Sequence, residues 1–105
     1  MVCNMIFVLT TCKKTTEAKR IATMLLRLRL IGCAKWWPIA SAYHWEGKLQ
    51  QSREVVLLCE APKKNFTKIE RLIRRAHSYE TPCIVSWGIQ RGSKQYLRWL
   101  HKVTS

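Results

Sequence analysis

Residues 33–61, CAKWWPIASAYHWEGKLQQSREVVLLCEA, decide the fold that we expect from this sequence. Segments 33–45 and 52–61 are apolar and rich in aromatic or β-branched residues, which is typical of strands. Glu-Gly-Lys at 46–48 turns the chain between them, so the two segments predict a long β-hairpin. Pro38 cannot donate a hydrogen bond to a neighbouring strand, and it therefore predicts a bend or an edge position in the first strand.

One strand and one helix precede the hairpin. Residues 3–12 are apolar at both alternating positions, as in a strand that is buried on both faces. Thr15 or Thr16 offers an N-cap for the helix, and Gly32 is its expected end. The apolar positions of this helix recur at helical spacing: Ala18, Ile21, Ala22, Leu25 and Leu28.

A helix, a strand and a last helix follow the hairpin. Residues 62–77 predict the second helix, with Pro62 near its start. Residues 81–89 predict the fourth strand, and Ser93 is the expected N-cap of the C-terminal helix. The apolar positions of the two helices are Phe66, Ile69, Leu72, Ile73 and Ala76, then Tyr96, Trp99, Leu100 and Val103.

The expected order is β-α-β-β-α-β with an added C-terminal helix. This order predicts an α+β fold of the ferredoxin-like type, in which two helices cover one face of a four-stranded sheet. Three of the strands are apolar on both faces, so the uncovered face would expose a large apolar patch. We therefore expect an oligomer that buries this second face.

The composition describes a small, strongly basic, globular chain. Its 105 residues, 48% of them hydrophobic, suffice for a single domain spanning residues 1–105. The five Cys are odd in number and none are spaced as C-x-x-C, so we expect reduced thiols rather than a disulfide framework or a zinc knuckle. The apolar runs are too short to span a bilayer and the N-terminus lacks the features of a signal peptide. We therefore expect a cytoplasmic protein without membrane contacts.

We expect no enzymatic activity. The sequence contains no G-x-S-x-G, H-E-x-x-H, P-loop or G-x-G-x-x-G motif. Six scattered Glu and no Asp do not suggest paired catalytic carboxylates. A nucleophilic Cys–His pair stays open as an alternative, because five Cys and three His are present.

Six short motifs together resemble one known family. They are FVLTTC, RLIGCAKWWP, YHWEGKL, EVVLL, HSYETP and YLRWL, in this order along the chain. With this order and spacing, the sequence from about residue 5 to residue 103 resembles the CutA family of divalent-cation tolerance proteins. The resemblance implies a homotrimer of ferredoxin-like subunits whose sheets pack around a three-fold axis. It also implies a link to copper and divalent-cation tolerance, with no enzymatic reaction.

The resemblance places the tip of the hairpin beside the HSYETP segment, in a cleft between chains. Tyr43 and Trp45 alternate onto one face of the strand, so they serve either to pack across this boundary or to bind a ligand there. The candidate cleft residues are Tyr43, Trp45, Glu46, Lys48, Tyr79, Glu80 and the thiol of Cys33.

Several residues are candidate metal ligands by their type, but only one of them matches a copper ligand of the family. Copper favours imidazole and thiolate ligands, so His44, His77, Cys12, Cys33 and Cys83 are candidates. In family members with an assigned copper site, the ligands are a first-strand Cys and two adjacent His. These fall at Thr10, Ala76 and His77 here, so His77 alone matches.

Cys12 lies two residues from Thr10 and on the same side of the strand, which makes it a candidate substitute for the missing thiol. His77 and Cys12 are thus the candidate ligands for copper or another divalent cation. The alternative for His77 is a residue stabilised at the C-terminal end of a helix by the helix dipole.

The excess of basic residues suggests a second function. Nineteen Lys and Arg against six Glu give a net charge of +13, and no Asp is present. A solvated surface normally mixes both signs, so this chain is expected to bind nucleic acid or other polyanions electrostatically, whether its charge is natural or the result of surface recharging. The candidate residues are Arg20, Arg27, Lys68, Arg71, Arg75, Lys94, Arg98 and Lys102.

Overall fold

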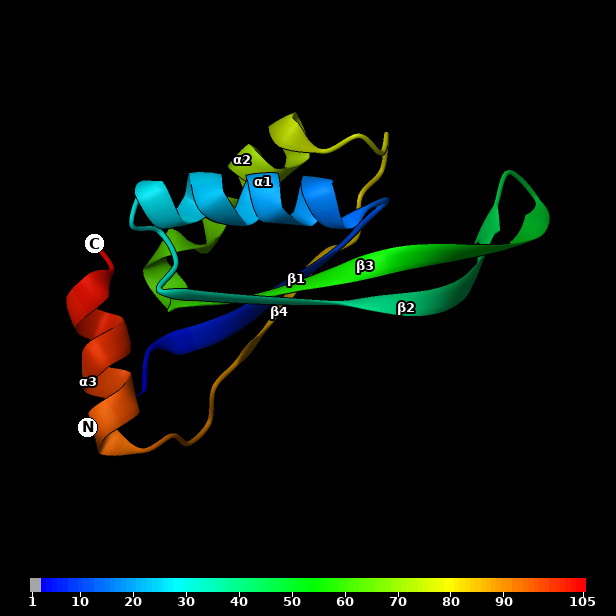
Figure 1. The fold of residues 1–105 in the computed structure, drawn as a ribbon. Coiled ribbons are helices and arrows are strands. Elements are labelled where there is room, and N and C mark those ends of the chain that lie inside the picture. Colours follow the sequence, from blue (N-terminus) through cyan, green and yellow to red (C-terminus); the bar gives the residue numbers. More distant parts are fainter. Residues whose placement is uncertain (1–2) are drawn as a thin grey trace.

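The computed structural model of the protein describes residues 3–105, and its elements follow the expected order (Figure 1). The α+β fold of the ferredoxin-like type is confirmed. The elements are β1 (Met5–Cys12), α1 (Thr15–Arg27), β2 (Cys33–Trp45), β3 (Lys48–Pro62), the short 3₁₀ helix η1 (Lys63–Asn65), α2 (Phe66–Ala76), β4 (Ile84–Gly88) and α3 (Lys94–Val103). No helix among residues 3–105 is long and apolar enough to cross a membrane.

The four strands form one antiparallel sheet in the order β2-β3-β1-β4. Figure 1 shows α1 and α2 side by side over one face of this sheet. Between them and the sheet lies the core, in which Ile21, Leu57 and Ile73 are each 0% exposed. Burial of such side chains is the main source of stability.

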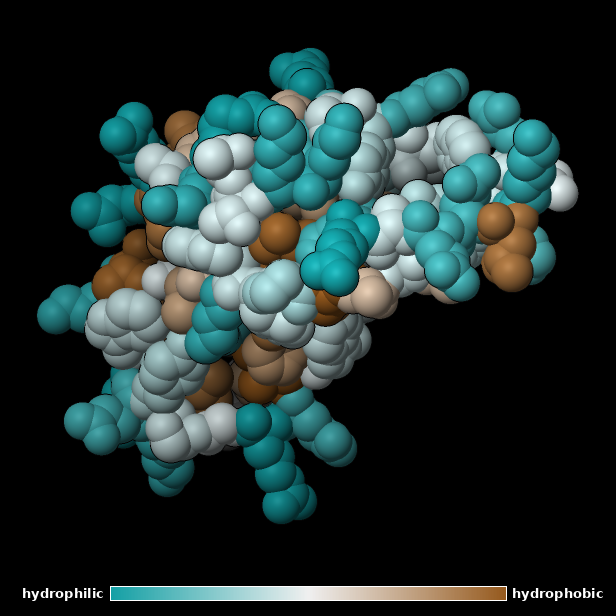
Figure 2. Space-filling model, turned by 45° about the vertical axis from the view of Figure 1, so that its right-hand side comes forward, coloured by the Kyte–Doolittle hydropathy of each residue, from teal (hydrophilic) through white to brown (hydrophobic). Residues whose placement is uncertain are grey.

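The opposite face of the sheet is not covered by α1 or α2. The strand pairing puts Trp37, Val85 and Trp87 on this face, where they are 42%, 48% and 47% exposed. We call it the helix-free face because neither α1 nor α2 covers it, although Tyr96 of α3 bonds Glu60 at its end. Trp87 packs against Phe7, with ring centroids 5.3 Å apart. Figure 2 shows apolar side chains at the surface of the body, with hydrophilic side chains projecting around them.

β2 and β3 form a hairpin whose distal end projects well beyond the helices (Figure 1). Glu46 and Gly47, with φ of 51° and 75°, make a tight two-residue turn of the kind that suits the twist of a hairpin. Lys48 pairs with Trp45, so β3 begins earlier than the expected residue 52. β2 is an edge strand, as Pro38 predicted, but it runs without interruption.

The ends of α1 differ from those expected. Lys14, not Thr15 or Thr16, is the N-cap, and its side chain makes no capping bond. The Glu17 carboxylate instead accepts the Lys13 backbone N–H at 3.1 Å. At the other end the helix stops at Arg27, and Arg29 takes the left-handed conformation with φ of 57°, so the chain leaves the helix before Gly32, the expected end.

The later elements also begin or end at other residues than expected. Pro62 is the last residue of β3 rather than the start of a helix, because η1 intervenes before α2. β4 is shorter than residues 81–89 and covers only Ile84–Gly88. Ser93 caps α3 as predicted, since its hydroxyl accepts the Tyr96 backbone N–H at 3.2 Å.

Gly32 is needed for close packing, not for ending α1. A Cβ atom at this position would lie 2.5 Å from Leu100 Cδ1 and 3.0 Å from Val103 Cγ2, both in α3. Gly32→Ala is therefore expected to lower the free energy of unfolding by about 1–3 kcal/mol, measured by urea denaturation. Gly88→Ala is the matched control, because a Cβ there meets nothing within 4 Å. Equal stability of the two variants would contradict this role.

Candidate functional site

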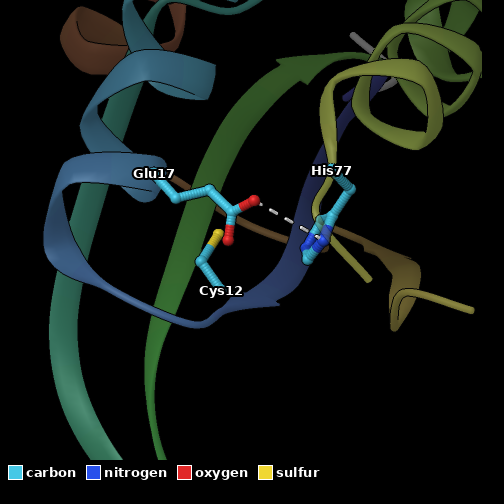
Figure 3. Close-up of side chains that lie close together, drawn as sticks. All are labelled: Cys12, Glu17 and His77. Carbon is cyan, nitrogen blue, oxygen red and sulfur yellow. Dashed lines mark ion pairs between the residues drawn. The ribbon is translucent and has the colours of Figure 1, made fainter. Parts of the chain in front are cut away.

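Three side chains that could bind a metal ion converge below the start of α1 (Figure 3). They are Cys12 at the end of β1, Glu17 in the first turn of α1, and His77 directly after α2. One ligand atom from each lies within 4.8 Å of the others. Cys12 is 0% exposed, Glu17 is 7% exposed, and the side chain of His77 is fully buried. We call this group the Cys12–Glu17–His77 cluster.

Backbone groups hold His77 in place and define its protonation. Nε2 lies 2.8 Å from the Thr11 carbonyl oxygen, and Nδ1 accepts the Tyr79 backbone N–H at 3.1 Å. A carbonyl oxygen only accepts hydrogen bonds, so Nε2 carries the proton and Nδ1 has the lone pair, which accepts the Tyr79 N–H. Nδ1 also lies 3.9 Å from Glu17 Oε2. A ligating His with its other nitrogen bonded to a backbone carbonyl is the usual arrangement in metal sites.

Burial and hydrogen bonding determine the protonation states of Cys12 and Glu17. Burial, followed by the nearby Glu17 carboxylate, raises the pKa of the Cys12 thiol to about 12. Burial alone would raise the pKa of Glu17 as well, but hydrogen bonds from the Lys13 backbone and from Ser78 lower it overall. At neutral pH the cluster therefore holds a neutral thiol and a charged carboxylate, and an ion that binds sulfur must displace a proton.

The donor set suits a divalent transition metal. Sulfur, imidazole nitrogen and carboxylate oxygen are all ligands of Zn²⁺, and copper takes the first two readily. Zn²⁺ holds its ligands at about 2.0–2.3 Å, so the cluster must contract by about 1 Å to surround an ion. An ion bound here would also have to displace the Tyr79 N–H from Nδ1. The three side chains would supply three ligands, fewer than the four that a structural zinc site takes from protein.

The two other positions that the resemblance assigns to copper ligands do not contribute a donor atom of the same kind. Thr10 is buried on the same side of β1 as Cys12, and its hydroxyl has no hydrogen-bond partner among the described residues. Ala76 has no donor atom. His44 lies on the projecting hairpin, and the Cys33 sulfur accepts a hydrogen bond from Lys35 at 3.3 Å. Neither belongs to the cluster.

A cleft of about 690 Å³ lies between the hairpin and residues 78–83, within one chain. Four of the expected cleft residues line it: Tyr43, Trp45, Tyr79 and Glu80. Glu46 and Lys48 lie at the hairpin turn and Cys33 lies at the far end of β2, so these three are outside the lining. The other lining residues are Thr11, Ser41, Ala42, Gln50, Glu54, Ser78, Thr81 and Cys83.

Glu54 is the buried acid of this cleft. It is 8% exposed, and its two oxygens accept hydrogen bonds from Ser41 Oγ at 2.5 Å and from the Tyr79 hydroxyl at 2.7 Å. Burial, together with the hydrogen bond to Glu54, raises the pKa of the Tyr79 hydroxyl, which therefore stays the donor. Among residues 3–105, no Lys, Arg or His side chain forms an ion pair with Glu54.

The segment after α2 joins the cluster to the cleft. Ser78 donates its backbone N–H to Glu17 Oε2 at 2.8 Å and its hydroxyl to Glu17 Oε1 at 3.1 Å. Tyr79 donates its N–H to His77 in the cluster and its hydroxyl to Glu54 in the cleft. Two consecutive residues thus contact both sites.

Glu17 and Glu54 were missed by the sequence interpretation. A Glu in the first turn of a helix is ordinary, because the helix dipole favours it there, so nothing marked Glu17 as a ligand. The sequence marks Glu54 only weakly. It begins the apolar strand EVVLL, and a charged residue in such a strand is unusual because charged side chains are seldom fully buried.

The eight candidate polyanion-binding residues are all exposed, but they are spread over three helices. Arg20 and Arg27 line a shallow groove of about 510 Å³ along α1, together with Lys19. Figure 1 shows α3 at one end of the sheet, outside the pair of helices formed by α1 and α2. The basic residues therefore form a general positive surface rather than one continuous groove.

Comparison with known proteins gives concordant matches over nearly the whole chain. The family model described as "CutA1 divalent ion tolerance protein" matches residues 6–103. The divalent-cation tolerance protein CutA of Archaeoglobus fulgidus is 35% identical over 94 residues, which cover 90% of this chain and 92% of that protein. A solved structure of the periplasmic divalent cation tolerance protein CutA from A. fulgidus aligns with a TM-score of 0.92 and 33% identity, covering 94% and 97% of the two chains. The divalent cation tolerance protein Cut A1 from Thermus thermophilus aligns with a TM-score of 0.92 and 31% identity, covering 96% and 99%.

Proposed function

Because this chain belongs to the family of CutA1 divalent ion tolerance proteins, we propose that it binds a divalent metal ion through the Cys12–Glu17–His77 cluster. The function is binding and not catalysis. The observation that carries the proposal is the convergence of a thiol, a carboxylate and an imidazole from β1, α1 and the segment after α2, within 4.8 Å of one another. The description of the family supports a divalent metal ion as the ligand, and the three donor atoms support the Cys12–Glu17–His77 cluster as its site.

Calorimetric titration of the full chain with Zn²⁺ tests the proposal. We expect one ion per chain, and an affinity at least ~100-fold lower in Cys12→Ser and in His77→Ala, because each loses one of three ligands. Cys83→Ser is the matched control, since this exposed thiol lies outside the cluster. Titrations in buffers of different ionisation enthalpy should show about one proton released per ion at pH 7, because the Cys12 thiol is neutral.

Titration with Co²⁺ gives a second measurement that does not depend on comparing affinities. A thiolate bound to Co²⁺ produces a charge-transfer absorption band, which we expect in the wild-type protein and not in Cys12→Ser. Wild-type affinity in both ligand variants, together with an unchanged Co²⁺ spectrum, would overturn the assignment of the ion to this cluster. A preference for copper over Zn²⁺ is expected from the general order of divalent metal affinities.

We propose that the protein acts as a homotrimer. The support comes from the exposed Trp37, Val85 and Trp87 on the helix-free face, because soluble chains seldom leave such a patch open to water. β2, at one edge of the sheet, also offers backbone groups that a neighbouring strand can pair with. The trimer itself follows from the family resemblance.

A second candidate function, electrostatic binding of nucleic acid or another polyanion, is favoured by the net charge of +13 and by the basic groove along α1. The two functions differ in their response to salt. Phosphate binding weakens steeply as salt rises, whereas coordination of a metal by buried ligands responds little. For its location we propose the cytoplasm, where the free thiols stay reduced.

A further inference from the structure

We propose that the cleft between the hairpin and residues 78–83 binds a small organic cation, an ammonium or guanidinium group carried on a flat or apolar body. This goes beyond metal binding and does not depend on it, because none of the three cluster residues lines the cleft. The cleft has the size of an ordinary small-molecule site, which spans about 300–1,000 Å³.

The first argument is the uncompensated charge of Glu54. A buried carboxylate normally has a cationic partner, because removal from water is costly unless the charge is paired. Glu60 follows this rule on the same sheet face, with Lys35 Nζ at 2.5 Å and the Tyr96 hydroxyl at 2.6 Å. Glu54 has equivalent hydroxyl donors but no ion pair among the described residues. A ligand cation would supply the missing charge.

The second argument is the aromatic surface around this acid. In the single chain, Tyr43 and Trp45 are 42% and 40% exposed, and they line the cleft with Tyr79. Aromatic faces attract cations and also stack against flat groups. Both hairpin side chains are carried on β2, so the strand, not a loose loop, sets their position.

The third argument is the sign of the charge in the cleft compared with the rest of the chain. Glu54 and Glu80 line it, and no Lys or Arg does, although the chain has 19 of them. An anionic ligand would find many better places on this molecule. A negative cleft with aromatic walls therefore selects for cations.

Benzylammonium and benzyl alcohol are suitable probes, because they share a shape and differ in charge. We expect benzylammonium to bind the full chain at least ~10-fold more tightly than benzyl alcohol, with the Trp45 indole NMR signal shifting on titration. Glu54→Gln keeps the size of the side chain and removes the charge, so it should abolish this difference between the two probes. Glu46→Gln is the matched control, since Glu46 lies next to Trp45 but outside the lining.

A second variant keeps the test valid if Glu54→Gln does not fold. Trp45→Leu removes the aromatic wall from an exposed position, and it should weaken benzylammonium at least ~5-fold while leaving the urea unfolding curve unchanged. Equal binding of the two probes would overturn the proposal. So would the absence of benzylammonium binding up to ~10 mM, as expected if a basic side chain of a second copy fills the cleft. The two probes are titrated into the protein with a wild-type cluster and no added metal, so failure of Zn²⁺ binding and failure of benzylammonium binding are separate results.

Discussion

Trp87→Arg is expected to convert the proposed trimer into single chains of 12.3 kDa. Trp87 lies in β4 on the helix-free face and is 47% exposed in the single chain, so its replacement leaves the core beneath α1 and α2 intact. In a trimer that buries this face, an Arg would bring an unpaired charge into an apolar contact, at a cost of several kcal/mol per subunit. Because the three-fold axis repeats the substitution in each subunit, the trimer bears this cost three times, and we expect it to dissociate.

Native mass spectrometry and light scattering at micromolar concentration check this expectation. The wild-type protein should have three times the mass of the chain, and Trp87→Arg should have the mass of one, with an unchanged circular dichroism spectrum. Leu28→Arg is the matched control, because Leu28 is 51% exposed at the end of α1, away from the helix-free face. A wild-type monomer would refute the trimer, and a trimeric Trp87→Arg variant would refute the role of this face.

Glu17→Ala is expected to lower the free energy of unfolding by about 2–3 kcal/mol, measured by urea denaturation in the presence of a chelator. The carboxylate accepts the Lys13 backbone N–H and two hydrogen bonds from Ser78. Its removal leaves these donors without a partner and frees the segment after α2 from the start of α1. Thr16→Ala, at an exposed neighbouring position, should change stability by less than about 0.5 kcal/mol.

The contribution of Glu17 depends on pH in a defined direction. Hydrogen bonds lower its folded-state pKa below the ordinary value of 4.5, so the charged form is favoured in the folded state. Its stabilisation is therefore fully present above about pH 4.5 and is lost as the pH falls through the lower, folded-state value. The stability difference between the wild-type protein and Glu17→Gln should shrink as the pH is lowered from 6 to 3. A difference that stays constant over this range would contradict the lowered pKa.

The order of the elements could be predicted because it depends on local periodicity. Short windows of sequence show the strands, whose residues alternate between apolar and polar or are apolar throughout. They also show the apolar stripes of the helices and the Glu-Gly turn. Helix ends were less predictable. Gly32 was the expected end of α1, but the chain leaves the helix earlier, with Arg29 in the left-handed conformation. Gly32 is required instead by its contact with α3, which lies far away in the sequence. Such contacts leave no local pattern.

Only part of the candidate site could be predicted from the sequence. Cys12 and His77 were identified by residue type and by resemblance, and the structure brings them together. Glu17 joins them because the start of α1 lies beside the end of α2, where Arg20 donates to the Ala76 carbonyl and Ser78 to Glu17. Glu54 is a buried acid without an ion pair among the described residues. The sequence could not show this, because it depends on where the Lys and Arg side chains lie in three dimensions.

Ser78 and Tyr79 make the two sites of this molecule interdependent. An ion that takes His77 Nδ1 must displace the Tyr79 N–H, and an ion that draws in Glu17 competes with both hydrogen bonds from Ser78. The same Tyr79 holds Glu54 through its hydroxyl. A metal ion bound in the proposed cluster would therefore change the hydrogen bonding of the cleft through Tyr79. Thermodynamic reciprocity requires the converse, by the same factor: a cation in the cleft that tightens Tyr79 on Glu54 must make the metal ion bind more weakly.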